Sequence, residues 1–108
     1  MKIKYMNSLL LTIMLLMSII THAQTAVLSG KINSNNAPVE FANVFLEGTQ
    51  LGSSTDIDGQ FFIKDIPAGT YKVVASSLGF EGDAKTVTLK ENESTILNFD
   101  LIKYSSSL

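Results

Sequence analysis

The segment Asp56–Phe80, which reads DIDGQFFIKDIPAGTYKVVASSLGF, decides the fold of this chain. Asp58 followed by Gly59 is a strong signal for a hairpin turn, because glycine adopts the positive φ that tight turns require. Pro67 fixes its own φ and Gly69 relieves the bend two residues later, which predicts a second turn. The segment therefore reads as strands joined by tight turns, with a further corner at its end.

Between these turns, hydrophobic side chains recur at every second position, as they do in strands that bury one face. Phe61 and Ile63 share one face of a strand, and Tyr71, Val73 and Ala75 share one face of the next. Such positions build a core and supply no catalytic group. The segment predicts a structural scaffold.

The rest of the chain repeats the pattern of short strands and frequent turns. No window after residue 23 shows a convincing helical period. Strands are expected at roughly ten-residue spacing, at residues 25–32, 41–47, a short one ending at 55, 60–64, 70–77, 85–90 and 95–102. Their inward positions are expected to be Leu28, Gly30, Ile32, Ala42, Val44, Leu46, Val87, Leu89, Leu97, Phe99 and Leu101. The sequence thus predicts an all-β fold, a seven-stranded antiparallel β-sandwich.

The first 23 residues have the layout of a secretory signal peptide. Lys2 and Lys4 form a basic start, Leu9–Ile20 is an almost unbroken apolar run, and Ala23 stands where a small residue precedes cleavage. The run holds about a dozen residues against the ~20 needed to span a bilayer, which favours a signal-peptide helix over a retained membrane anchor. We therefore expect a signal peptide at 1–23, a domain at 24–102, and a linker or truncated tail at 103–108.

Composition excludes one class of partner. Without Lys2 and Lys4 the chain holds ten acidic residues against six lysines, and it has no arginine. Nucleic acid binding relies on clustered lysine and arginine, so no nucleic acid partner is expected. The chain also has no cysteine, so its stability depends on packing alone and a lipoprotein-type anchor is excluded.

The sequence offers little for catalysis or cofactor binding. The single histidine, His22, lies in the presumed leader, and without cysteine the common nucleophile–base pairs are missing, so no catalytic residue, enzyme activity or cofactor is expected. Asp56 and Asp58 point the same way on a strand and are a weak candidate for calcium. The alternative is that both carboxylates hydrogen-bond the turn backbone, which the sequence favours because further ligands in register are missing.

Three phenylalanines do not fit the expected core faces. Phe41, Phe45 and Phe62 fall on the side of their strands opposite the inward positions. A bulge or sheet corner would bring them inside, which is the expectation we favour. Alternatively they stay exposed and form an apolar contact patch for a partner.

The motif residues of this chain resemble those of a known family. The resemblance covers about Val27–Leu101. The residues of its motif are Gly59, Phe61, Pro67, Gly69, Tyr71, Gly79 and Phe80. This pattern resembles the carboxypeptidase-regulatory-like domain, a transthyretin-like β-sandwich. The resemblance implies the same sandwich here.

A signal peptide followed directly by this domain resembles the N-terminus of SusC-type TonB-dependent outer-membrane receptors, and residues 104–108 resemble the linker that follows it. The resemblance implies a non-catalytic accessory domain in the periplasm or outer membrane. Its partner would be the receptor barrel or the TonB system, in nutrient or glycan uptake. The chain holds no barrel strands, so we expect a truncated receptor end or a free periplasmic module.

Two other functions remain open. One is a free-standing secreted module that binds a carbohydrate or a peptide. Sugar binding relies on exposed aromatic residues, and residues 24–108 contain no tryptophan and only Tyr71 and Tyr104 as tyrosines. The other is a stalk domain in an adhesin-like assembly, which predicts tandem copies that the sequence does not contain.

Overall fold

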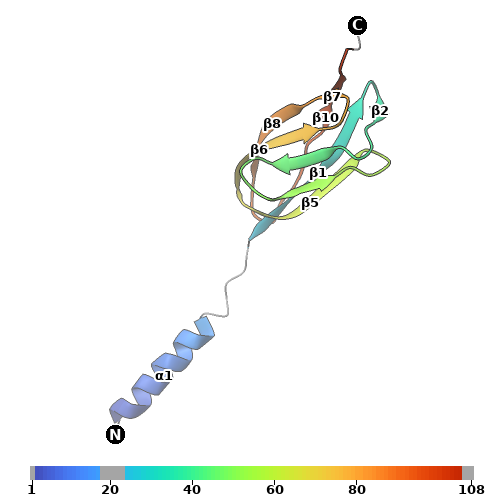
Figure 1. Cartoon of the computed structure of the whole chain (residues 1–108). Helices are drawn as coiled ribbons and strands as arrows, with labels where there is room; N and C mark the ends of the chain where they lie inside the picture. Colours follow the sequence, from blue (N-terminus) through green and yellow to red (C-terminus); the bar gives the residue numbers. More distant parts are fainter. Residues whose placement is uncertain (1, 18–23, 106–108) are drawn as a thin grey trace.

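The computed structural model describes residues 2–17 and 24–105, which form one helix and eleven strands (Figure 1). The helix is α1 (Lys2–Met17). The strands are β1 (Thr25–Ser34), β2 (Ala37–Pro38), β3 (Asn43–Leu46), β4 (Gly52–Ser54), β5 (Gln60–Pro67), β6 (Gly69–Ser76), β7 (Phe80–Glu81), β8 (Asp83–Leu89), β9 (Ser94–Ile96), β10 (Phe99–Asp100) and β11 (Ile102–Lys103). Within the described ranges, no helix combines the length and the apolar character that a bilayer crossing requires.

The first sheet has five strands, and β1 pairs with all the others. β5 lies antiparallel to one side of β1, with a register shift between Ala26 and Leu28. β9 and β10 pair with β1 in the parallel direction, and β2 folds back antiparallel on its end. The turn into β2 uses Asn35 and Asn36, whose φ values of 53° and 65° suit a two-residue hairpin.

The second sheet has the order β4-β3-β6-β8, and its neighbours are all antiparallel. A separate two-stranded ribbon pairs β7 with β11, so the chain leaves the domain beside the Leu78-Gly79-Phe80 corner. The Tyr104 amide extends this ribbon by donating to the Gly79 carbonyl at 3.0 Å.

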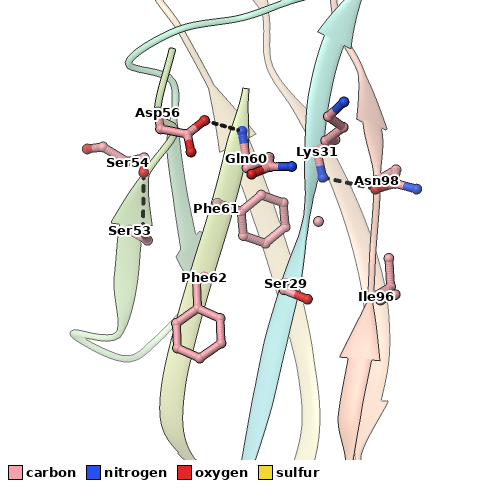
Figure 2. A pocket seen from close by; sticks show the side chains of 11 residues that line it. Ser29, Lys31, Ser53, Ser54, Asp56, Gln60, Phe61, Phe62, Ile96 and Asn98 are labelled. Carbon is pink, nitrogen blue, oxygen red and sulfur yellow. Dashed lines mark hydrogen bonds between the residues drawn. The ribbon is translucent and has the colours of Figure 1, made fainter. Parts of the chain in front are cut away.

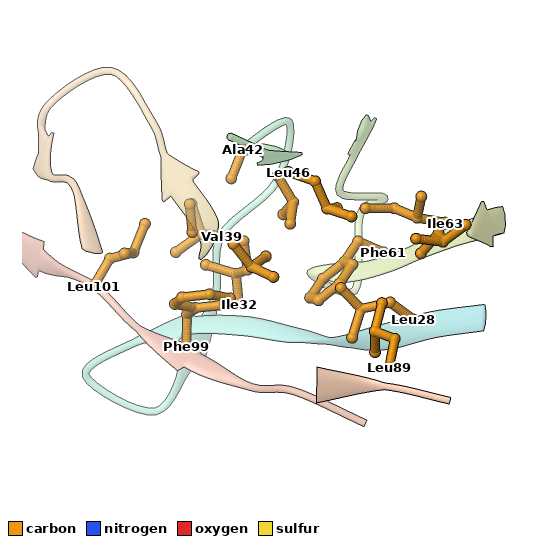
Figure 3. Packing of buried hydrophobic residues seen from close by; sticks show 14 of the residues in the cluster. Leu28, Ile32, Val39, Ala42, Leu46, Phe61, Ile63, Leu89, Phe99 and Leu101 are labelled. Atoms are coloured by element: carbon orange, nitrogen blue, oxygen red, sulfur yellow. The ribbon is translucent and has the colours of Figure 1, made fainter. Parts of the chain in front are cut away.

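The core lies between the two larger sheets (Figure 3). Its members are Ala26, Leu28, Ile32, Val39, Ala42, Val44, Leu46, Phe61, Ile63, Ile66, Val73, Ala75, Leu89, Phe99 and Leu101. Most of the predicted inward positions are among them, while Leu97, Val87 and Tyr71 are partly buried against the cluster. Among the described residues, all members of this core fall between residues 26 and 101, so β1 to β11 share one core to which α1 contributes no residue.

The predicted β-sandwich is confirmed, and three details differ from the expectation. The strand expected at 95–102 is divided into β9, β10 and β11, and its first two parts run parallel to β1. The strand expected at 41–47 begins at Asn43, because Phe41 has a φ of 59° in a turn. The first strand extends to Ser34, so the turn there is shorter than expected. The predicted cleavage region with His22 and Ala23 lies outside the described residues, as do residues 106–108.

The parallel pairing depends on Gly30 in the middle of β1. A Cβ at Gly30 would overlap the carbonyl oxygen of Leu97 and would lie 2.9 Å from Cε1 of Phe61. The Leu97 amide meanwhile donates to the Ser29 carbonyl at 2.8 Å, which holds the 97–98 segment against β1. Only glycine allows the backbone between β9 and β10 to lie this close.

Gly30→Ala should therefore destabilise the domain by about 3 kcal/mol, because the new methyl group must push the Leu97 backbone away. Gly82→Ala is the matched control, since its Cβ would meet nothing nearer than the Ala75 carbonyl oxygen at 3.6 Å. Gly82→Ala should change the free energy of unfolding by no more than about 0.5 kcal/mol. Urea denaturation of residues 24–105 measures both, and equal effects of the two substitutions would contradict this role for Gly30.

Candidate binding groove on the five-stranded sheet

A groove of about 650 Å³ lies on the outer face of the five-stranded sheet (Figure 2). Strands β1, β5 and β9 form its floor, and residues of β4 and of the following turn contribute to its border. It is lined by Ser29, Gly30, Lys31, Ser53, Ser54, Asp56, Gln60, Phe61, Phe62, Ile96 and Asn98. We call this surface the β1 groove.

The first row of the β1 groove is apolar at both sides. Strand pairing places Ser29 between Phe62 on β5 and Ile96 on β9. Both flanking side chains are solvent-exposed, Phe62 by 58% and Ile96 by 73%. Figure 2 shows the three residues on neighbouring strands. The small serine thus leaves a shallow space between two exposed hydrophobic groups.

The second row of the β1 groove is polar. Lys31 pairs with Gln60 on β5, and the Lys31 amide donates to Oδ1 of Asn98 at 2.9 Å. Lys31 is not part of the ion pair found in the described part of the chain, which joins Lys72 and Glu47 at 3.4 Å on the other sheet. The row therefore presents an ammonium group and two side-chain amides next to the apolar row.

Asp56 forms the turn at the end of the β1 groove. Its Oδ1 accepts hydrogen bonds from the amides of Asp58 and Gln60, both at 2.9 Å. Gly59 is buried in the same turn with a φ of 75°, and its amide donates to the Asp56 carbonyl at 3.0 Å. The Asp56 carboxylate thus has the turn-forming role that the sequence favoured.

Asp56 and Asp58 do not act as two equivalent carboxylates. Asp58 contributes its backbone amide to the turn, and its exposed carboxylate makes none of the hydrogen bonds found in residues 24–105. No group of three or more potential metal ligands occurs in the described ranges. The weak calcium assignment stays a prediction without support from further ligands.

Thr55 is a structural residue that sequence reasoning missed. It is buried, its hydroxyl donates to the Val39 carbonyl at 2.6 Å, and it accepts from the Ala42 amide at 2.8 Å. The Thr55 amide also donates a hydrogen bond to the Ala42 carbonyl, and the Thr55 carbonyl accepts one from the Phe41 amide. This side chain ties the turn before β3 to the segment that enters the Asp56 turn. Its partners are 13 and 16 residues away, so no local pattern marks it.

The three phenylalanines are exposed, so the expectation that a bulge or corner would bury them is wrong. Phe41 is exposed by 73%, Phe45 by 39% and Phe62 by 58%. They do not lie together on one surface. Phe62 lies in the β1 groove, Phe45 is on β3 in the other sheet, and Phe41 is in the turn before it. Phe62 is the more exposed of the two that line a groove with polar groups; Phe45 lines a second groove, with Asn43 and Ser76.

The motif residues occupy the corners of the sandwich. Gly79, like Gly59, has a positive φ, of 89°. The hydroxyl of Tyr71 donates to the Pro67 carbonyl at 2.6 Å and so braces the turn between β5 and β6. Gly69 stands beside the Tyr71 ring, where a Cβ would lie 3.5 Å from it. Phe61 is in the core and Phe80 is partly buried in the β7–β11 ribbon. These residues shape the domain and do not line a common site.

Fold and groove together define a β-sandwich domain with an open groove on its five-stranded sheet. The chain belongs to the CarboxypepD_reg-like domain family, whose family model matches residues 28–108. This confirms the resemblance found in the sequence motif. A comparison with curated proteins finds no match.

Solved structures share the fold. A type II cohesin–X-dockerin complex from Acetivibrio cellulolyticus matches with a TM-score of 0.64 and 22% identity over 72% of this chain and 58% of that chain. The minor pilin GBS52 of Streptococcus agalactiae matches with a TM-score of 0.62 and 14% identity, over 79% of this chain and 47% of that chain. A candidate carbohydrate-binding protein from Bacteroides uniformis matches with a TM-score of 0.56 and 20% identity, over 73% of this chain and 42% of that chain. This chain therefore spans about half the length of the chains that it matches.

Proposed function

We propose that this chain is an exported, non-catalytic β-sandwich accessory domain of a TonB-dependent outer-membrane receptor. It contacts a protein partner in the periplasm or outer membrane, either the receptor barrel or the TonB system, during nutrient or glycan uptake. The observation that carries the proposal is a family domain, matched over residues 28–108, that directly follows a leader-like N-terminus.

The apolar surface of α1 supports export. Its side chains Met6, Leu9, Leu10, Leu11, Ile13 and Met14 are each exposed by 48–72%. Helices of soluble domains normally bury such residues along one face. Their exposure fits a segment that membrane-associated export machinery recognises and a peptidase removes.

The character of the β1 groove supports binding over catalysis. Residues 2–17 and 24–105 contain no histidine and no cysteine, so the common nucleophile–base pairs are not available there. The groove is open and presents one exposed aromatic ring beside amides and an ammonium group. Such surfaces contact partners. The shared fold with a cohesin–X-dockerin complex and with a pilin is in keeping with a protein partner.

The second candidate is carbohydrate binding, which one observation favours. Phe62 offers an exposed ring face in the apolar row. In the neighbouring polar row, Gln60, Lys31 and Asn98 offer hydrogen-bonding groups. A sugar ring has apolar faces and a polar rim, so it complements these two rows. The candidate carbohydrate-binding protein from Bacteroides uniformis shares the fold.

Export is tested by producing the full chain in a Gram-negative bacterium and measuring the intact mass in each cell fraction. We expect a product that begins at Gln24 in the periplasmic or outer-membrane fraction. Leu11→Arg should block its export, because a charge interrupts the apolar run. Full-length chain confined to the cytoplasm would refute the proposal.

The receptor origin has its own readout, which is the coding sequence that follows codon 108. A frame for a plug and barrel, intact or broken, is expected there. Its absence, together with normal export, would leave a free periplasmic module.

The carbohydrate candidate predicts saturable heat when a glycan panel is titrated into residues 24–105. Phe62→Ala should weaken such binding at least about tenfold, or ~1.4 kcal/mol, because the stacking surface is lost. Phe45→Ala is the matched control on the other sheet and should leave it unchanged. Flat calorimetric traces across the panel would retire this candidate and leave the protein-contact proposal standing.

A further inference from the structure

Strand β8 is the longest regular edge strand of the sandwich. It pairs with β6 through seven consecutive residues, from Asp83 to Leu89, and with no other strand among the described residues. It contains no proline, no glycine and no register shift. An edge of this kind is a template on which another chain can add a strand.

Two hydrogen bonds show which backbone groups of β8 face outward. The Lys72 carbonyl accepts from the Glu47 amide on the β3 side, so Lys72 directs its backbone away from its β8 partner Thr86. The Ala84 amide likewise bonds the Asp83 carboxylate at 2.8 Å instead of β6. Since the pairs of an antiparallel ladder alternate, the amides and carbonyls of Thr86 and Thr88 point outward from the sheet.

Lys85 stands between these outward-facing positions with its side chain on the inner face. It pairs with Val73, which is fully buried, so its side chain points toward the five-stranded sheet. Its Nζ donates to the Asn98 carbonyl at 2.6 Å and lies 5.1 Å from the centre of the Phe99 ring. The ammonium group therefore bridges the open side of the sandwich, from β8 to the segment between β9 and β10.

An added strand would have to cover this ammonium group. A second antiparallel copy of β8 could place its Asp83 opposite Lys85 only in a register that pairs residues 83–85 of the two strands with each other. The registers with a longer overlap bring its own Lys85 or the apolar Val87 toward the ammonium group, and neither compensates a positive charge. The Asn98 carbonyl satisfies one of the three N–H donors of this ammonium group, so covering the group removes the water that solvates the others and disfavours the added strand. An inward-pointing lysine on an edge strand is a known means of preventing edge-to-edge association.

We propose that Lys85 prevents a second copy of this chain from adding a strand to β8, and so keeps the domain monomeric. The outer faces of the sheets, including the β1 groove, are then the surfaces left for partners. This role is independent of which ligand or receptor the domain contacts.

The test is the oligomeric state of residues 24–105, measured by light scattering after gel filtration at about 0.1–1 mM, a range in which exposed edges associate. The unchanged domain and Lys85→Arg should be monomeric. Lys85→Val should show a doubled mass or higher oligomers, since valine suits a strand and removes the charge. Circular dichroism verifies that each variant keeps its strands. If Lys85→Val unfolds, Lys85→Met replaces it with a side chain of similar length.

Two controls locate the association. Lys64→Val removes a charge from β5, where the side chain is exposed, and should remain monomeric. Adding Thr86→Pro to Lys85→Val should restore the monomer, because proline lacks the amide that faces the added strand and is tolerated on that side of an edge. A monomeric Lys85→Val, or association that persists with Thr86→Pro, would overturn the proposal.

Discussion

The absence of a side chain at Gly30 is the constraint on which the rest of the structure depends. Every other strand of the first sheet pairs with β1, and two of them reach it only because Leu97 can place its carbonyl where a Cβ would otherwise be. The amide of Leu97 then bonds the Ser29 carbonyl. Through this close approach β9 and β10 pair with β1 at Leu28 and Ile32, which are completely buried.

The β1 groove is a consequence of the same pairing. Because β5 and β9 are both in register with β1, Phe62, Ser29 and Ile96 align in one row across three strands. The polar row next to it follows from the next pairs along the strands, with Asn98 held by the Lys31 amide. The edges of the sandwich are short, bulged or, at β8, occupied by a charge. With the role proposed for Lys85, contact is expected on the faces and not at the edges.

The local features of this fold could be predicted from the sequence. The Asp58-Gly59 turn, the Pro67–Gly69 turn and the alternation along β5 and β6 are set by residues close to one another in the chain. The parallel direction of β9 and β10 could not, because alternation has a period of two whichever way the neighbouring strand runs. The division of the last strand likewise depends on Gly30, which is 67 residues before Leu97.

The site was less predictable for the same reason. Exposure of Phe62 depends on which face of β5 meets the core, and the sequence could not choose between a bulge and an exposed ring. Thr55 and Asn98 act through partners 13 to 67 residues away. The carboxylates of Asp56 and Asp58 looked equivalent in the sequence, yet only Asp56 accepts hydrogen bonds from the turn.

The most direct test of a protein-contacting face is site-specific photo-crosslinking in the bacterium that produces the chain, with the photoreactive residue at position 62 or, for comparison, at 45. The account predicts an adduct from position 62 that contains an outer-membrane receptor or TonB-system polypeptide, whereas no adduct at 62, or equal adducts from both positions, would contradict it.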